Sequence, residues 1–158
     1  METDVVFTRS SSGAEVIDRL IRSASRSVMA ALYRFHSPQL ASALKDAGEK
    51  GASVRICLNN NDHYDENRAA QATLAGLGLS FRLLSGKAGN GSKMHHKFLV
   101  IDGRTTVTGS YNWTPESESR NYENLIVLHD LRLAAAYSEE FEALWNEGGL
   151  PPAASLRP

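Results

Sequence analysis

Residues 93–124 read KMHHKFLVIDGRTTVTGSYNWTPESESRNYEN, and this stretch determines both the sheet and the site that the sequence predicts. A run of bulky apolar residues covers 98–101, and a second run with strand propensity covers 104–108. The Asp102-Gly103 pair between them is favoured in tight β-hairpin turns. The sequence therefore predicts a hairpin whose two turn residues are Asp102 and Gly103.

This turn sets the pairing of the polar residues that flank the two strands. With a two-residue turn the paired residue numbers sum to 205, so Lys97 faces Thr108. By the same count His95 faces Ser110, and Asn112 follows just beyond the strand end. A longer turn would slide the pairing by a residue or two. It would leave the polar groups at the same end of the hairpin.

The residue types gathered there suit a phosphate group better than a metal ion. Strand alternation puts His95 and Lys97 on one side and His96 on the other. A lysine beside His95 disfavours a cation, and no Cys or carboxylate cluster has zinc-site spacing, so we predict no metal. Lys, Ser110 and Asn112 can bind anionic oxygens, and a His can be a nucleophile or a general acid. The alternative is a polar strand end that only holds a loop in place; the complete set favours the phosphate site.

These residues resemble the HKD motif of the phospholipase D superfamily. The spacing is His95-x-Lys97, four residues, Asp102, six residues and Gly109-Ser110-x-Asn112, followed by Glu123. The segments MHHKFLVID, GSYNWT and RNYEN are similar to the corresponding segments of the small single-motif members. These are the bacterial Nuc-type endonucleases and the animal mitochondrial enzyme described both as a cardiolipin hydrolase and as a nuclease. The resemblance extends more loosely over residues 5–147.

Composition bounds the remaining possibilities. The 158 residues, 42% hydrophobic and 22% charged, predict one globular domain, 1–147, with a flexible tail, 148–158. The net charge of -1 gives no general basic surface, so any site for a polyanion must be local. Cys57 is the single cysteine, and we expect a buried hydrophobe without a disulfide. The chain shows no apolar run of 18 residues and no signal-peptide core, so we expect a cytoplasmic protein without a transmembrane segment.

Strand and helix patterns alternate along the chain. Besides the hairpin we expect strands at 5–7, 27–33, 53–58, 80–84 and 125–128, and helices at 13–24, 38–50, 65–76 and 130–147. Strand, helix, strand at this spacing indicates right-handed parallel crossovers. The predicted fold class is α/β, a mixed β-sheet sandwiched between helices on both faces, in agreement with what the resemblance implies.

Further residues are candidates for the rim of a substrate groove. The segment 86–93, GKAGNGSK, lacks the Lys-Ser/Thr pair of a nucleotide-binding loop and precedes a strand, so we reject that function. We expect a mobile basic lip in which Lys87 and Lys93 meet a polyanion, or else a plain flexible loop. Arg34 and the loop from Asn59 to Asp62 would complete a groove for a single strand.

The resemblance implies an assembly and a mechanism. Family enzymes build one site from two HKD motifs, and this chain has one, so we expect a homodimer that joins two copies of His95 on a two-fold axis. It implies a two-step transfer without metal or cofactor, in which one His95 attacks phosphorus and the other protonates the leaving oxygen. Lys97 and Asn112 would hold the phosphate oxygens, with Ser110 in support, while Glu123 would orient His95. We interpret Asp102 as a structural turn residue in spite of its place in the motif.

Three functions compete at this point. The resemblance of these segments to the small nuclease-like members favours a nuclease acting on single-stranded DNA or RNA. A phospholipase acting on membrane phospholipid such as cardiolipin is the alternative, although no amphipathic interfacial helix is visible in the sequence. A catalytically silent nucleic-acid-binding module is the third, and the intact His95, Lys97, Asn112 and Glu123 set argues against it. A substrate panel would separate the three.

Overall fold

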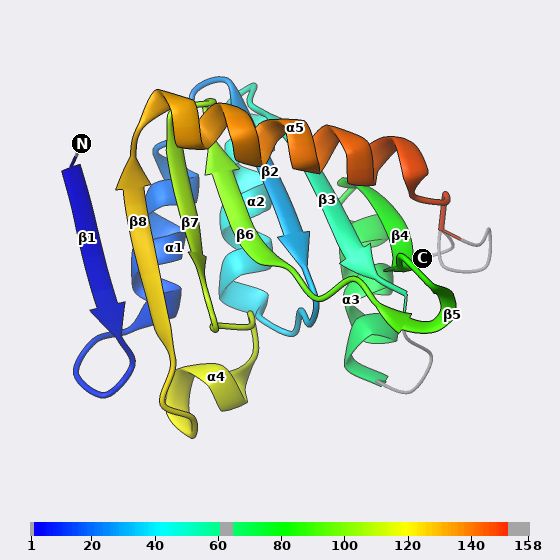
Figure 1. The fold of residues 1–158 in the computed structure, drawn as a ribbon, viewed down its shortest axis with the longest axis horizontal. Coiled ribbons are helices and arrows are strands. Elements are labelled where there is room, and N and C mark those ends of the chain that lie inside the picture. Colours follow the sequence, from blue (N-terminus) through cyan, green and yellow to red (C-terminus); the bar gives the residue numbers. More distant parts are fainter. Residues whose placement is uncertain (1, 61–64, 152–158) are drawn as a thin grey trace.

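The alternating strands and helices form one mixed sheet. A computed structural model describes residues 2–60 and 65–151, in which eight strands have the order β1-β8-β7-β6-β2-β3-β4-β5 (Figure 1). Their bounds are β1 Glu2–Phe7, β2 Ser27–Leu32, β3 Ser53–Asn59, β4 Ser80–Gly86, β5 Gly89–Lys93, β6 Lys97–Ile101, β7 Thr105–Gly109 and β8 Asn124–His129.

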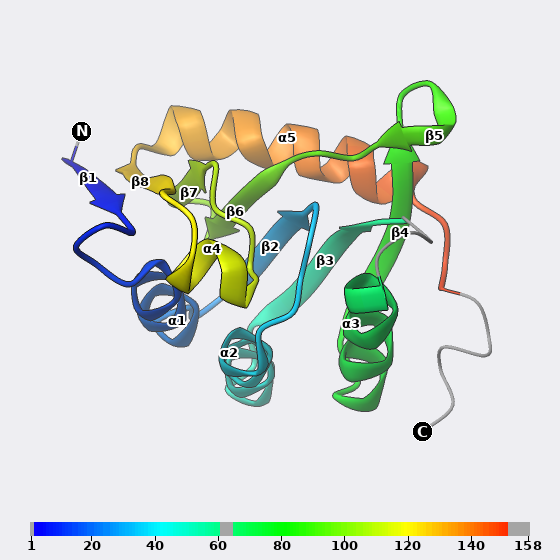
Figure 2. The same cartoon turned by 90° about the horizontal axis from the view of Figure 1, so that it is seen from below.

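Helices cover both faces of this sheet, as the sequence predicts. They are α1 Gly13–Arg22, α2 Pro38–Glu49, α3 Asp65–Gly76, α4 Pro115–Ser119 and α5 Leu131–Glu147. Figure 2 shows α1, α2 and α3 on one face and α5 running across the other. The predicted fold class is therefore confirmed. None of the helices in the described ranges has the length and apolar character needed to cross a bilayer.

The chain direction of the strands determines which segments meet at one edge of the sheet. β2 pairs in parallel with β3, and β3 with β4, so the predicted crossovers through α2 and α3 are confirmed. β6 is antiparallel to β2, β7 to β6 and β8 to β7. The end of β2, the start of β6, the end of β7 and the start of β8 therefore share one edge. That edge carries the candidate site.

Two apolar cores lie on the two faces because successive strand residues point to opposite sides. Ala30 and Leu32 of β2 pack into the core beneath α1, α2 and α3. Met29 and Ala31 of the same strand pack into the core beneath α5. Cys57 belongs to this second core, and burial raises the pKa of its thiol to about 12, so it is the buried hydrophobe that the sequence predicts.

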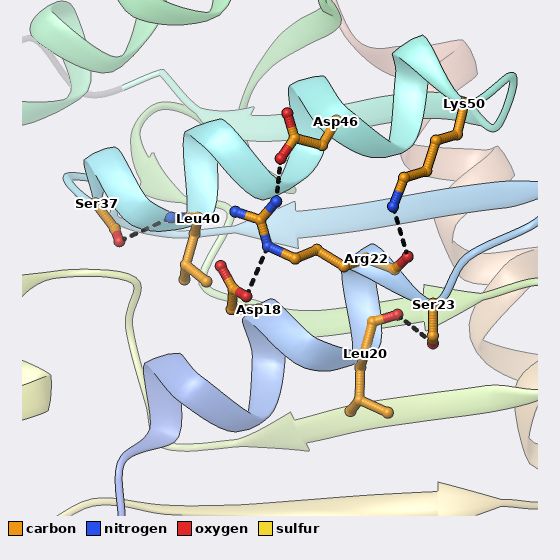
Figure 3. Close-up of polar contacts among 8 residues, drawn as sticks. All are labelled: Asp18, Leu20, Arg22, Ser23, Ser37, Leu40, Asp46 and Lys50. Atoms are coloured by element: carbon orange, nitrogen blue, oxygen red, sulfur yellow. Dashed lines mark hydrogen bonds and ion pairs between the residues drawn. The ribbon is translucent and has the colours of Figure 1, made fainter.

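Polar contacts tie α1 to α2 on the outer side of the first core (Figure 3). Arg22 of α1 donates to Asp18 of the same helix at 2.8 Å and also to Asp46 of α2. Lys50 at the end of α2 donates to the carbonyl oxygen of Arg22 at 3.5 Å. Ser37 begins α2 by accepting the backbone N–H of Leu40, as an N-cap does. These contacts fix the two helices against each other.

The hairpin register differs from the prediction by one residue. Phe98 pairs with Thr108 and Ile101 with Thr105, so paired numbers sum to 206 and the turn holds three residues, 102–104. Asp102 and Gly103 both adopt left-handed backbone conformations, with φ of 55° and 64°. The two-residue turn was wrong because the Asp102 carboxylate bonds to the chain segment that enters β2, a contact distant in sequence. The polar groups stay at the predicted end.

Three further segments differ from the sequence prediction. The expected loop at 86–93 contains strand β5, which pairs antiparallel with β4. The short helix α4 was not predicted. It begins at Pro115, after an N-cap at Thr114. The expected tail starts later than residue 148, because Gly149 exchanges both backbone hydrogen bonds with Leu83, at 2.9 and 3.0 Å.

Candidate active site

His95 and Lys97 meet where the chain enters β6. The Nζ of Lys97 lies 3.2 Å from Nδ1 of His95 and donates to the His95 carbonyl oxygen at 2.8 Å. The two side chains therefore share one side of the strand, as the alternation predicts. An ammonium donating to Nδ1 leaves the ring proton on Nε2 in the neutral form of His95. A nucleophilic Nε2 would need the proton on Nδ1, with an acceptor beside it.

His96 points to the opposite face of the sheet. Its Nε2 lies 3.2 Å from Oε1 of Glu140 on α5, and its ring packs edge-on against Phe98 with centroids 5.3 Å apart. The side chain is therefore separated from the Lys97 side by the strand itself. His95 and His96 therefore lie on opposite sides of the strand, as the alternation predicts.

Tyr33 is the residue of this site that the sequence reasoning missed. It directly follows β2, and its ring centroid lies 4.2 Å from that of His95, at an interplanar angle of 50°. The same ring lies 5.0 Å from Nζ of Lys97 and 5.8 Å from Nζ of Lys93. An aromatic face attracts cations without carrying a net charge that would repel a phosphate. Its position at the end of a buried strand was the signal available in the sequence.

The environment lowers the pKa of both basic residues. Partial desolvation is the main cause for His95, and the nearby charges of Lys97 and Lys93 act in the same direction. Desolvation also lowers the pKa of Lys97, while Glu123 opposes the change. The imidazole of His95 therefore stays neutral to lower pH than an ordinary histidine. A neutral ring is the form that can attack phosphorus.

Ser110 and Glu123 meet at the same edge, where β7 ends and β8 begins. Ser110 donates its hydroxyl hydrogen to Oε2 of Glu123, and Ser117 and Asn121 donate to Oε1 at 3.1 and 3.2 Å. The structure records no bond between this carboxylate and His95 of the same chain. The expected orientation of His95 by Glu123 therefore remains a prediction for an assembled site.

Asn112 lies between these groups and helix α4. Its backbone N–H donates to Oγ of Ser117 at 3.2 Å, which fixes the main chain at this position. Its side-chain Oδ1 is buried and has no hydrogen-bond partner in the described structure. Unpaired buried polar atoms are uncommon in folded proteins. Exchanging the amide O and N positions would place a donor here, as a phosphate oxygen requires.

The four rim candidates are three cations, which differ in exposure, and one buried amide. Arg34 is half-buried, whereas Lys87 and Lys93 are exposed on the β4–β5 hairpin. Asn59 is fully buried, and its Oδ1 accepts the backbone N–H of Met94 at 2.9 Å. It therefore cannot line an open rim and instead holds the chain just before His95. Asn60 of the expected loop donates its backbone N–H to the carbonyl oxygen of Leu84 at 2.6 Å, and residues 61–62 lie outside the described ranges.

Metal-ligating side chains are not grouped in the part of the chain that the structure describes. Across 2–60 and 65–151, no three His, Cys, Asp or Glu side chains come together as a cation would require. Apart from the Glu123 carboxylate, the residues at the candidate site are two bases, a hydroxyl and an amide. This donor set matches an anionic ligand.

Comparison with known proteins places this chain in a family. A family model described as "Cardiolipin synthase, PLD-like domain" matches residues 17–145. The chain belongs to this family. Two relatives named mitochondrial cardiolipin hydrolase, from Xenopus tropicalis and Homo sapiens, are 34% and 31% identical over 128 and 138 residues. These alignments cover 81% and 85% of this chain but only 59% and 53% of those proteins, so the chain spans little more than half their length.

Solved structures agree with the fold. Nuc from Salmonella typhimurium, a phospholipase D family member, matches with a TM-score of 0.86 and 27% identity, covering 95% of this chain and 97% of that chain. NucT from Helicobacter pylori matches with a TM-score of 0.76 at 22% identity, covering 95% and 100%. The phospholipase D resemblance read from the HKD motif is thereby confirmed.

Proposed function

We propose that this PLD-like domain is a metal-independent phosphodiesterase that cleaves single-stranded nucleic acid. The observation that carries the proposal is the placement of Lys97 beside His95 on one side of the strand, with both against the ring of Tyr33. A partly desolvated, neutral imidazole beside a cation can attack phosphorus while the cation binds a nonbridging oxygen. The Nuc match over nearly the whole chain favours a nuclease.

The proposed reaction proceeds in two steps. The imidazole of one His95 attacks phosphorus and forms a P–N bond, while the P–O bond to the leaving group breaks. His95 of a second copy gives its proton to the leaving oxygen. Water then attacks the phosphohistidine, the second His95 takes a proton from that water, and the P–N bond breaks. Lys97 and Asn112 hold the charged oxygens throughout, with Ser110 in support.

A second copy is needed because one chain holds one histidine on the Lys97 side of the strand. Within one chain, Glu123 bonds to Ser110 and Ser117 instead of His95. A homodimer would supply both the second imidazole and a proton acceptor for Nδ1. We therefore expect the active species to be a dimer in light scattering at the assay concentration. A monomer with full activity would contradict this expectation.

The proposal is tested by a substrate panel in excess EDTA. The panel contains single-stranded and double-stranded DNA, single-stranded RNA, and vesicles that contain cardiolipin. We expect cleavage of single-stranded nucleic acid to persist in the chelator, because the proposed chemistry uses only side chains. Complete loss of activity in EDTA that magnesium or zinc restores would show that a metal takes part.

Phospholipid hydrolysis is the second candidate function. It is favoured by the relatives named mitochondrial cardiolipin hydrolase, of which the Xenopus tropicalis protein is 34% identical over 81% of this chain. The same His95 chemistry would serve, since both substrates are phosphodiesters. Release of phosphatidic acid from the vesicles, together with intact oligonucleotides, would favour this function over the nuclease.

A further inference from the structure

Two large aromatic side chains lie open to solvent beside the candidate site. Phe7 is 57% exposed and Tyr122 is 78% exposed. The other Phe, Tyr and Trp side chains in the described ranges are buried or half-buried, as expected for apolar rings. Exposed apolar surface next to a polar site commonly marks the place of a ligand or a partner.

Tyr122 and its neighbours form a hollow at the edge of the sheet. The guanidinium of Arg9 lies 4.3 Å from the centroid of the Tyr122 ring. Phe7 ends β1 and pairs with Asn124 at the start of β8. These rings, with Arg9, Ser10 and Glu123, line a hollow of about 300 Å³. The hollow therefore has aromatic walls, one cation and one carboxylate.

This hollow shares one residue with the candidate site. Glu123 lines the hollow and accepts the hydroxyl hydrogen of Ser110. β6, β7, β8 and β1 are successive neighbours in the sheet (Figure 1). At about 4.8 Å between strands, the start of β8 lies about 10 Å from the start of β6 and the end of β1 about 14 Å from it. A strand whose phosphate sits at Lys97 can reach the hollow with an adjoining nucleotide.

We propose that Tyr122 and Arg9 form a stacking subsite for a nucleobase that adjoins the cleaved phosphodiester of a single-stranded substrate. The proposal rests on the proposed nuclease function. It adds a second contact between enzyme and substrate, made by a base next to the reacting phosphate. Aromatic rings and guanidinium planes both stack on bases without reading their sequence. Arg9 also places a positive charge where the next phosphate passes.

The chemistry of the hollow favours a nucleic acid strand over a second copy of this chain. Charged residues are depleted in the core of protein interfaces, whereas the guanidinium of Arg9 lines this hollow. The exposed aliphatic side chains Val5 and Leu131 lie outside its lining. An acyl chain in the hollow would remove water from the Arg9 guanidinium without giving it a hydrogen-bond acceptor. Stacking on a base uses both the ring and the cation.

The test compares a fluorescent single-stranded 12-mer with methyl p-nitrophenyl phosphate, a diester too small to reach the hollow. Tyr122→Ala is expected to weaken binding of the 12-mer about tenfold, while hydrolysis of the small diester changes far less. Tyr122→Phe keeps the ring and should restore most of the affinity. Leu131→Ala, an exposed site outside the hollow, is the matched control and should match the wild type.

A scan of 12-mers that each lack one base makes the test specific. In a protein that keeps Tyr122, removing the base that sits on this ring should weaken binding as much as Tyr122→Ala does. The two losses of binding should not add. Binding is measured by anisotropy in the His95→Ala background, so the result stands even if the wild type cleaves none of these substrates. Additive losses at every position would overturn the subsite. A dimer that dissociates in Tyr122→Ala would overturn it as well, because the hollow would then be a subunit interface.

Discussion

A His95→Ala variant is expected to lose at least about 10⁴-fold in kcat on a phosphodiester, because it removes both the nucleophile and the general acid of the proposed site. The side chain is exposed, and its recorded contacts are with Lys97 and Tyr33, so the fold should be retained. Initial rates on a single-stranded oligonucleotide measure the effect. Circular dichroism and Tm verify the fold.

His96→Ala is the matched control for this variant. The two histidines are adjacent in sequence, but His96 faces α5 and contacts Glu140. Exposed pairs of this kind contribute little to stability, so the variant should keep most of its activity and its Tm. Equal losses of activity in the two variants would show that the two sides of the strand are not distinct in catalysis. The proposed role of His95 would then fail.

The fold was predictable to the extent that it depends on local pattern. The alternating strand and helix patterns placed most elements within a few residues of their observed bounds. The hairpin register was wrong because the turn at Asp102 is set by a contact with residues 25–27, far away in sequence. A local turn preference cannot report such a contact. Strand β5 was missed because its glycines carry no strand pattern.

The residues of the candidate site were also predictable only where local sequence pattern determines their place. His95 and Lys97 were found because their spacing on one strand is local and fixed by alternation. Tyr33 was missed because its place beside them depends on the antiparallel pairing of β2 with β6. Asn59 was assigned to an open rim, although it is buried and binds the backbone of Met94. An asparagine that ends a buried strand gives the same sequence signal in either role.

The second large effect concerns Asp102, whose replacement is expected to lower stability and spare catalysis. Its carboxylate accepts the backbone N–H groups of Ser25, Arg26 and Ser27 at 2.8–3.2 Å, and the Ser25 hydroxyl at 3.0 Å. These bonds join the hairpin turn to the segment that enters β2. Asp102 is seven residues from His95, about 23 Å along an extended strand at roughly 3.3 Å per residue. It lies too far away to touch the reacting phosphate in its own chain.

Asp102→Asn is the sharpest test because asparagine tolerates the left-handed backbone, with its φ of 55°, that the turn requires. The substitution therefore removes the charge and part of the acceptor capacity without adding backbone strain. Hydrogen bonds to a charged group are worth about 1.5–3 kcal/mol, so a loss of about 2 kcal/mol is expected. That loss should lower Tm by about 4–8 °C in a chain of this size. Specific activity of the folded dimer should stay close to that of the wild type.

The pH dependence of this effect has a definite sign. Burial opposes ionisation of Asp102, but the backbone bonds from Ser27, Ser25 and Arg26 outweigh it and lower the carboxyl pKa below its usual 3.8. The stabilisation is therefore complete above the unfolded-state pKa and is lost as pH falls through the lowered folded-state pKa. The Tm difference between wild type and Asp102→Asn should be largest near neutral pH and shrink below about pH 4. A fully folded dimer of Asp102→Asn that has lost activity by orders of magnitude would instead place this carboxylate in the chemistry, delivered across the subunit interface.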